Sequence, residues 1–102
     1  MKVISISELD DLIKIYFGQD HDLIVAGNEI FPKINAYIAS THKGQKYALI
    51  DDIDLFLSEC DDLEKDFEQR YEYDFGPELW GTTATEFLAL VREKVSGALA
   101  IP

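Results

Sequence analysis

Apolar residues recur along the chain at the three-to-four-residue spacing that is typical of amphipathic helices. The clearest pattern covers residues 49–57. The same spacing predicts a helix over residues 7–17, a second that begins at Asn28 and a last one that ends at Gly97. With one shorter helix before the last, we expect a compact all-α bundle of about five helices, a single domain over residues 1–102.

Each predicted helix has a set of apolar positions that we expect to be buried. In chain order they are Leu9, Leu12, Ile13 and Tyr16; Ile30, Phe31, Ile34, Tyr37 and Ile38; Leu49, Ile50, Ile53, Phe56 and Leu57; Leu63, Phe67 and Tyr71; and Ala84, Phe87, Leu88, Val91 and Val95. Small polar residues mark the expected starts, because their side chains can accept hydrogen bonds from unpaired backbone N–H groups. The expected caps are Ser7 or Ser5 with Glu8, Asn28, Asp61 with Glu64, and Thr82 or Thr83 with Glu86.

The other side of the middle helix is acidic. At 100° per residue, the positions that lie opposite the apolar ones are Asp51, Asp54, Leu55, Ser58, Glu59 and Asp62, with Asp52 on the flank. This arrangement predicts an acidic ridge with Leu55 near its middle.

The charge of the chain is concentrated in one region. Twenty acidic and nine basic residues give a formal charge of −11, and residues 51–74 alone hold eleven acids and two bases, a balance of −9. At 47%, hydrophobic residues are frequent enough for the chain to fold despite this excess of acid. A strongly negative surface repels nucleic acids and anionic membranes and attracts a cationic partner. A solvated face that serves solubility is the alternative explanation.

The cysteine count and the apolar runs bear on the compartment. Cys60 is the single cysteine and cannot close a disulfide within the chain. No apolar run approaches the roughly 20 residues that a spanning helix needs. We expect neither a signal peptide nor a membrane anchor, and a cytoplasmic location.

The polar residues do not form a catalytic or metal-binding pattern. Exposed carboxylates keep their ordinary pKa and are poor general acids, which argues against a hydrolase. His21 and His42 lie in different predicted loops without metal-ligand spacing, so we expect both to be solvated. Residues 20–22 resemble the start of a calcium loop, but Ile24 and Val25 stand where oxygen and glycine are required. Acidic neighbours raise the pKa of the Cys60 thiol. We therefore expect no catalytic residue, no cofactor, no metal and no enzymatic activity.

Aromatic residues follow the acidic region, and two interpretations of them stay open. Tyr71, Tyr73, Phe75 and Trp80 are of the types that form interface hot spots. Alternatively, the segment folds back to complete the core, which we favour for Phe75 and Trp80. The hydroxyls of Tyr71 and Tyr73 suit half-exposed positions.

Three ordered motifs resemble a known family. The segments are Tyr16-Phe17-Gly18-Gln19-Asp20-His21-Asp22-Leu23, then Leu49-Ile50-Asp51-Asp52-Ile53-Asp54-Leu55-Phe56-Leu57, and finally Gly81-Thr82-Thr83-Ala84-Thr85-Glu86-Phe87-Leu88 with Val91-Arg92. In order and spacing they are similar to small immunity proteins of contact-dependent growth inhibition systems, the CdiI type.

The resemblance implies a cytoplasmic protein, not an enzyme, that binds the C-terminal toxin domain delivered by a neighbouring cell in a tight 1:1 complex. It points to a ribonuclease toxin, RNase A-like, whose basic active-site cleft an acidic ridge would complement. The candidate toxin-binding residues are Asp51, Asp54, Leu55, Glu59, Asp62, Tyr71, Tyr73, Asp20 and Asp22. Asp20 and Asp22 could instead bond backbone N–H groups in their loop, with Gln19 as a buried amide. An acidic DNA mimic that inhibits a nucleic-acid-binding protein is the second hypothesis.

Overall fold

The computed structural model describes residues 5–18, 30–72 and 75–100, and within these ranges every regular element is helical. The α-helices are α1 (Ser7–Leu12), α3 (Ile30–Ser40), α4 (Lys43–Glu59), α5 (Leu63–Arg70) and α6 (Ala84–Ala100). A π-helical turn, η1 (Ile13–Phe17), continues α1, and a 3₁₀ turn, η2 (Pro77–Trp80), precedes α6. The predicted all-α bundle is confirmed.

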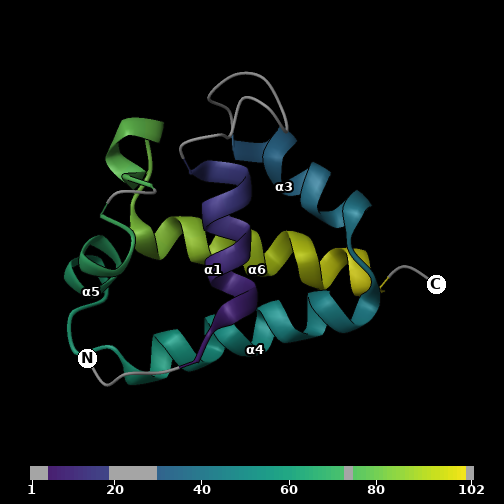
Figure 1. Cartoon of the computed structure of the whole chain (residues 1–102), viewed down its shortest axis with the longest axis horizontal. Coiled ribbons are helices and arrows are strands. Elements are labelled where there is room, and N and C mark those ends of the chain that lie inside the picture. Colours follow the sequence, from purple (N-terminus) through teal and green to yellow (C-terminus); the bar gives the residue numbers. More distant parts are fainter. Residues whose placement is uncertain (1–4, 19–29, 73–74, 101–102) are drawn as a thin grey trace.

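Two long helices, α4 and α6, form the base on which the rest of the bundle packs. In Figure 1, α1 passes in front of both long helices. α3 and α4 lie on opposite sides of α6, and α5 lies at the C-terminal end of α4. The predicted helix over residues 7–17 is confirmed as α1 and η1 together. The second predicted helix is α3, but its expected cap, Asn28, lies outside the described residues.

The core follows the predicted helical faces closely. All five apolar positions expected in α6 are buried, with at most 1% of the side chain exposed. Aromatic rings fill the centre, where Phe75 lies 5.1 Å from Phe17 and 4.7 Å from Phe87, measured between ring centroids. Trp80 packs against the rings of Phe17 and Phe75. The interpretation of Phe75 and Trp80 as core residues is therefore confirmed.

Two predicted core residues are exposed instead. Phe31 is 49% exposed and Leu57 is 42% exposed. Phe31 meets the neighbouring helix α6 through the Lys94 ammonium group, which lies 5.0 Å from the centroid of its ring. Helical spacing alone cannot tell whether a residue at the edge of the apolar stripe is buried, because this depends on how much of the stripe the neighbouring helices cover. Gly97 does not end the last helix, which continues to Ala100.

The helix starts differ most from the prediction. α1 begins after Ile6 without a side-chain cap from either serine. α5 is capped by Asp62, not Asp61: the Asp62 carboxylate accepts a hydrogen bond from the Lys65 backbone N–H at 3.2 Å. At α6 the prediction of Thr83 is confirmed, since its hydroxyl accepts from the Glu86 backbone N–H at 3.1 Å.

His42 is also corrected, because it caps α4 and is not merely a solvated loop residue. Its ring Nδ1 accepts a hydrogen bond from the Gln45 backbone N–H at 3.2 Å, and the Gln45 side chain accepts from the His42 backbone N–H in return. This reciprocal pair is a capping box made with an imidazole in place of a hydroxyl. The accepting nitrogen must be unprotonated for the bond to form.

Candidate functional site

The exposed side of α4 presents apolar and acidic side chains together. We call this surface the α4 outer face and define it by Tyr47, Asp51, Asp54, Leu55 and Ser58, all of them exposed. Tyr47, Asp51 and Leu55 follow one another at four-residue intervals, so they lie along one line of the helix. The exposed fractions of Tyr47 and Leu55 are 57% and 37%. Tyr47 was missed from the sequence, although its position one turn before Asp51 could have indicated it.

Asp54 is paired within the protein. Its two carboxylate oxygens accept hydrogen bonds from Nε and Nη2 of Arg92 at 2.8 and 3.1 Å. This bidentate bond lowers the pKa of Asp54, and partial burial acts in the opposite direction without reversing the shift. Both side chains remain about half exposed, at 49% for Asp54 and 44% for Arg92. The pair neutralises one charge of the predicted acidic ridge without covering it.

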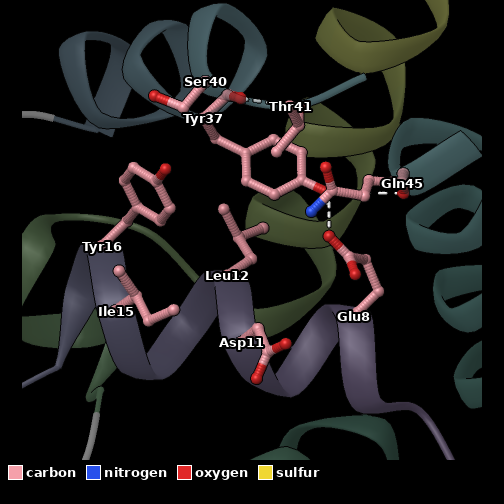
Figure 2. A pocket seen from close by; sticks show the side chains of 9 residues that line it. All are labelled: Glu8, Asp11, Leu12, Ile15, Tyr16, Tyr37, Ser40, Thr41 and Gln45. Atoms are coloured by element: carbon pink, nitrogen blue, oxygen red, sulfur yellow. Dashed lines mark hydrogen bonds between the residues drawn. The ribbon is translucent and has the colours of Figure 1, made fainter. Parts of the chain in front are cut away.

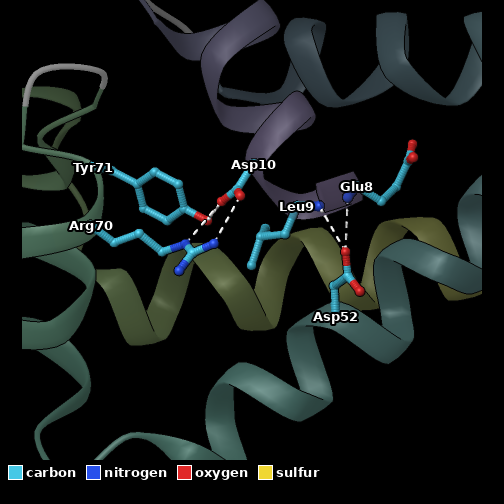
Figure 3. A network of polar contacts seen from close by, with 6 residues as sticks. All are labelled: Glu8, Leu9, Asp10, Asp52, Arg70 and Tyr71. Carbon is cyan, nitrogen blue, oxygen red and sulfur yellow. Dashed lines mark hydrogen bonds and ion pairs between the residues drawn. The ribbon is translucent and has the colours of Figure 1, made fainter. Parts of the chain in front are cut away.

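Asp52, next to Asp51 in the chain, has a structural role. One of its carboxylate oxygens accepts hydrogen bonds from the backbone N–H groups of Glu8 and Leu9, at 2.9 and 3.1 Å (Figure 3). These are the groups that α1 leaves unpaired at its first turn, so α4 supplies the cap that the serines do not. Burial raises the pKa of Asp52, and the nearby carboxylates of Asp10 and Asp51 add to this, although the two backbone bonds oppose the shift.

Several acids of the following segment also bind backbone groups. The Glu64 carboxylate accepts from the N–H groups of Ala84 and Thr85, both at 2.9 Å, and so supports the start of α6. Asp66 is buried and accepts from the Asp61 N–H at 3.2 Å. Several acidic side chains between residues 51 and 74, Asp52, Glu64 and Asp66 among them, therefore stabilise the fold by accepting hydrogen bonds from backbone N–H groups.

Other acids of this segment stay available to a partner. Four of them are exposed and accept no hydrogen bond from the side chains or backbone that the structure describes: Asp51, Asp61, Glu68 and Glu72. Asp62 is exposed as well as capping α5, and Glu59 is partly buried at the last position of α4. Of the predicted contact residues, Asp51 thus combines exposure with an unengaged carboxylate.

Tyr71 is a correction to the predicted site. Its side chain is fully buried, and its hydroxyl donates a hydrogen bond to Oδ1 of Asp10 at 2.7 Å. The guanidinium of Arg70 binds the same carboxylate through Nε and Nη2, at 2.9 and 2.8 Å (Figure 3). Burial alone would raise the pKa of Asp10, but the bonds from Arg70 and Tyr71 lower it overall. The Tyr71 hydroxyl finds its polar partner inside the bundle, so a half-exposed position is wrong.

The remaining predicted contacts cannot be placed. Tyr73, Asp20 and Asp22, together with Gln19, lie outside the described residues. They stay predictions.

The described residues hold no cluster of three or more His, Cys, Asp or Glu side chains suited to a metal ion. The Cys60 thiol is half-buried and donates to the Phe56 carbonyl at 2.6 Å. Burial and the nearby Asp66 raise the pKa of this thiol, which opposes formation of the reactive thiolate. Within the described part of the chain, no helix is both long enough and apolar enough to span a bilayer.

Comparison with known proteins places these features in a family. No curated protein and no solved structure matches the chain. Residues 5–95 match the model of a family described as CdiI immunity protein. The matched region contains all of α1, α3, α4 and α5 and most of α6. The match spans most of the 102 residues, and the chain therefore belongs to the CdiI immunity protein family of contact-dependent growth inhibition systems.

Proposed function

We propose that the protein neutralises a ribonuclease toxin, RNase A-like, by covering its basic active-site cleft with the α4 outer face. The complex is tight, has 1:1 stoichiometry and forms in the cytoplasm. Membership in the immunity family supports the general role, which is binding of a cognate toxin. The chemistry of the α4 outer face supports the particular mode of binding.

The observation that carries the proposal is the line of Tyr47, Asp51 and Leu55 on one exposed side of a long helix. Tyr and Leu side chains supply apolar contact area, and a carboxylate between them selects a cationic partner. Nucleases that bind RNA phosphates present such cationic surfaces. Complementary charge also accelerates association, which favours capture of a toxin before it acts.

The ion pair of Asp54 and Arg92 refines the role of Asp54. A basic residue of the toxin can share this carboxylate with Arg92, because the pair is exposed and its oxygens can accept further bonds. Glu59 and Asp62 flank this surface toward the end of α4 and extend its negative potential. Asp20, Asp22 and Tyr73 remain proposed contacts from the family resemblance.

Charge reversal at one exposed carboxylate tests the proposal. We expect the toxin domain to be the C-terminal domain of a large exoprotein encoded next to this gene, and binding to that domain is measured by surface plasmon resonance at several salt concentrations. We expect Asp51→Lys to weaken binding at least about tenfold and to reduce its salt dependence, with a further loss on Leu55→Ala. Cleavage of a fluorogenic RNA by the toxin, with each variant added, tests the ribonuclease assignment and the occlusion together.

A matched control is Glu78→Lys, which makes the same charge change in η2, away from α4 (Figure 1). It should bind as the wild type does. Equal losses for Asp51→Lys and Glu78→Lys would indicate a general charge effect and would contradict the proposed surface. Inhibition of several unrelated DNA-binding proteins by the wild-type chain would favour the DNA-mimic hypothesis instead.

A further inference from the structure

A cavity opens between α1 and α3, close to the start of α4. Its volume is about 150 Å³. Glu8, Asp11 and Tyr16 line it from the first helix, and Tyr37, Ser40 and Gln45 line it from the opposite side (Figure 2). A cavity of about this size can accept a planar group as large as benzene.

The charged groups that line the cavity are both acidic. Glu8 and Asp11 are three residues apart on α1; the Glu8 carboxylate points toward Tyr37, whereas the exposed Asp11 lies at the rim with its carboxylate directed away from Tyr37 (Figure 2). The Glu8 carboxylate already accepts a hydrogen bond from the Tyr37 hydroxyl at 2.7 Å. The ammonium group of Lys46 binds the carbonyl of Thr41, a residue that lines the cavity, although Lys46 itself is not part of the lining.

A second, independent feature is the hydroxyl of Tyr16. This side chain is only 9% exposed, and its ring packs edge-on against Tyr37 with centroids 5.7 Å apart. Among the described residues, nothing forms a hydrogen bond with the Tyr16 hydroxyl, which points into the cavity (Figure 2). A buried hydroxyl without a partner costs stability, and a ligand that supplies a donor would remove that cost.

We propose that this cavity receives the guanidinium group of an arginine side chain of the toxin. The inference rests on the proposed function, because it assumes that the partner is a basic protein. Guanidinium is planar, carries only hydrogen-bond donors and presents five N–H groups in a fan. The Glu8 carboxylate and the Tyr16 hydroxyl on the wall, with the exposed Asp11 at the rim, offer acceptors at separate points, which suits a fan of donors better than the single point charge of lysine. The tyrosine rings add a favourable surface for a cation.

The cavity lies close to α4, because Gln45 of α4 is part of its lining. Glu8 lines the cavity, its backbone N–H binds Asp52, and Asp52 precedes Ile53 and follows Asp51 on α4. The inference requires one partner both to contact Asp51 and to insert a side chain beside Glu8. Asp11, not Glu8, is the residue to replace in a test, because the Glu8 carboxylate also binds Tyr37.

The first experiment uses N-acetyl-arginine methylamide as the probe, titrated into the full-length protein and followed by NMR. We expect saturable shifts at the amides of Thr41 and Tyr16. N-acetyl-citrulline methylamide has nearly the same shape without the charge and should bind at least about fivefold more weakly, as should the arginine probe to Asp11→Asn. Glu78→Gln is the matched control and should bind like wild type. Equal binding of the two probes, or no effect of Asp11→Asn, overturns the proposal.

The second experiment measures affinity for the toxin domain. Tyr16→Phe removes only the unpartnered hydroxyl, so it should leave the urea midpoint at or above the wild-type value while it weakens toxin binding; Asp11→Asn should weaken binding further. If both variants bind the toxin as wild type does while Asp51→Lys does not, the proposed function stands and the cavity assignment is wrong. If Asp51→Lys also has no effect, the proposed binding surface itself fails.

Discussion

Asp51 and Asp52 are neighbours on α4, and we predict that their replacement separates binding from stability. The Asp52 carboxylate holds the backbone N–H groups of Glu8 and Leu9 at 2.9 and 3.1 Å. The Asp51 carboxylate accepts no hydrogen bond from the described residues and is exposed. Asp52→Ala should therefore destabilise the fold with little effect on toxin affinity, and Asp51→Ala should do the reverse.

The magnitude follows from the geometry of the cap. Loss of an N-cap acceptor costs about 0.5–2 kcal/mol, and Asp52 caps two N–H groups in a partly buried site. Burial raises the pKa of Asp52, so the charged form carries a penalty that disappears with the carboxylate. We therefore expect Asp52→Ala to cost about 1 kcal/mol of unfolding free energy, which corresponds to roughly 4–8 °C in Tm for a domain of this size. Asp52→Asn keeps an oxygen acceptor and should stay within about 0.5 kcal/mol of wild type.

Urea unfolding followed by circular dichroism is the assay, with toxin affinity measured at a temperature where every variant is folded. Asp51→Ala should leave the unfolding free energy within about 0.5 kcal/mol of wild type, as is usual for exposed sites. The m-value should be the same for all variants, since the surface exposed on unfolding does not change. Equal unfolding free energies for Asp51→Ala and Asp52→Ala would refute the capping argument. Loss of affinity confined to Asp52→Ala would refute the assignment of Asp51 to the binding surface.

Replacements at four further residues test interactions within the bundle. Tyr71→Phe should cost about 1.5–3 kcal/mol, because it removes a buried hydrogen bond to the charged carboxylate of Asp10; an unchanged urea midpoint would contradict this. Because the pKa of Asp10 is lowered by folding, its carboxylate stabilises the fold at pH values above the ordinary pKa of 3.8, and this stabilisation is lost as the pH falls through the lower pKa of the folded state. Asp10→Asn should therefore make the unfolding free energy less dependent on pH in the acid range. Glu64→Ala should lower the unfolding free energy by about 1 kcal/mol, because the first turn of α6 loses the acceptor of its backbone N–H groups. Glu64→Gln keeps an oxygen acceptor and should retain most of the stability in the same urea assay. Gly18→Ala should lower Tm, because the added Cβ would overlap the Lys14 carbonyl oxygen, and a Tm equal to that of wild type would refute the close approach.

The sequence predicted the helices and most of their buried faces because helical spacing is a local property. Val91 and Val95, for example, need only their own positions to be assigned to the core of α6. The caps depended on tertiary contacts. Ser7 precedes an apolar run and looks like a cap, but the acceptor that α1 uses comes from Asp52, 44 positions after Glu8.

The candidate site was predicted in part for the same reason. Exposure of Asp51 and Leu55 follows from the period of α4 alone. The burial of Tyr71 depends on Asp10, and the pairing of Asp54 depends on Arg92, so neither could be inferred within one helix. Partners separated by tens of residues leave no trace in a periodic pattern.

The first turn of α1 is capped by Asp52 of α4, and this has a consequence for the order of folding. α1 and η1 together have only 11 residues, which is too short for an isolated helix to persist in water. During synthesis this segment leaves the ribosome well before residue 52, so its first turn remains without its acceptor until α4 has formed and docked. The N-terminal helix is therefore expected to join the nascent bundle late, and its amide protons should exchange with solvent through an opening that leaves α4 and α6 together.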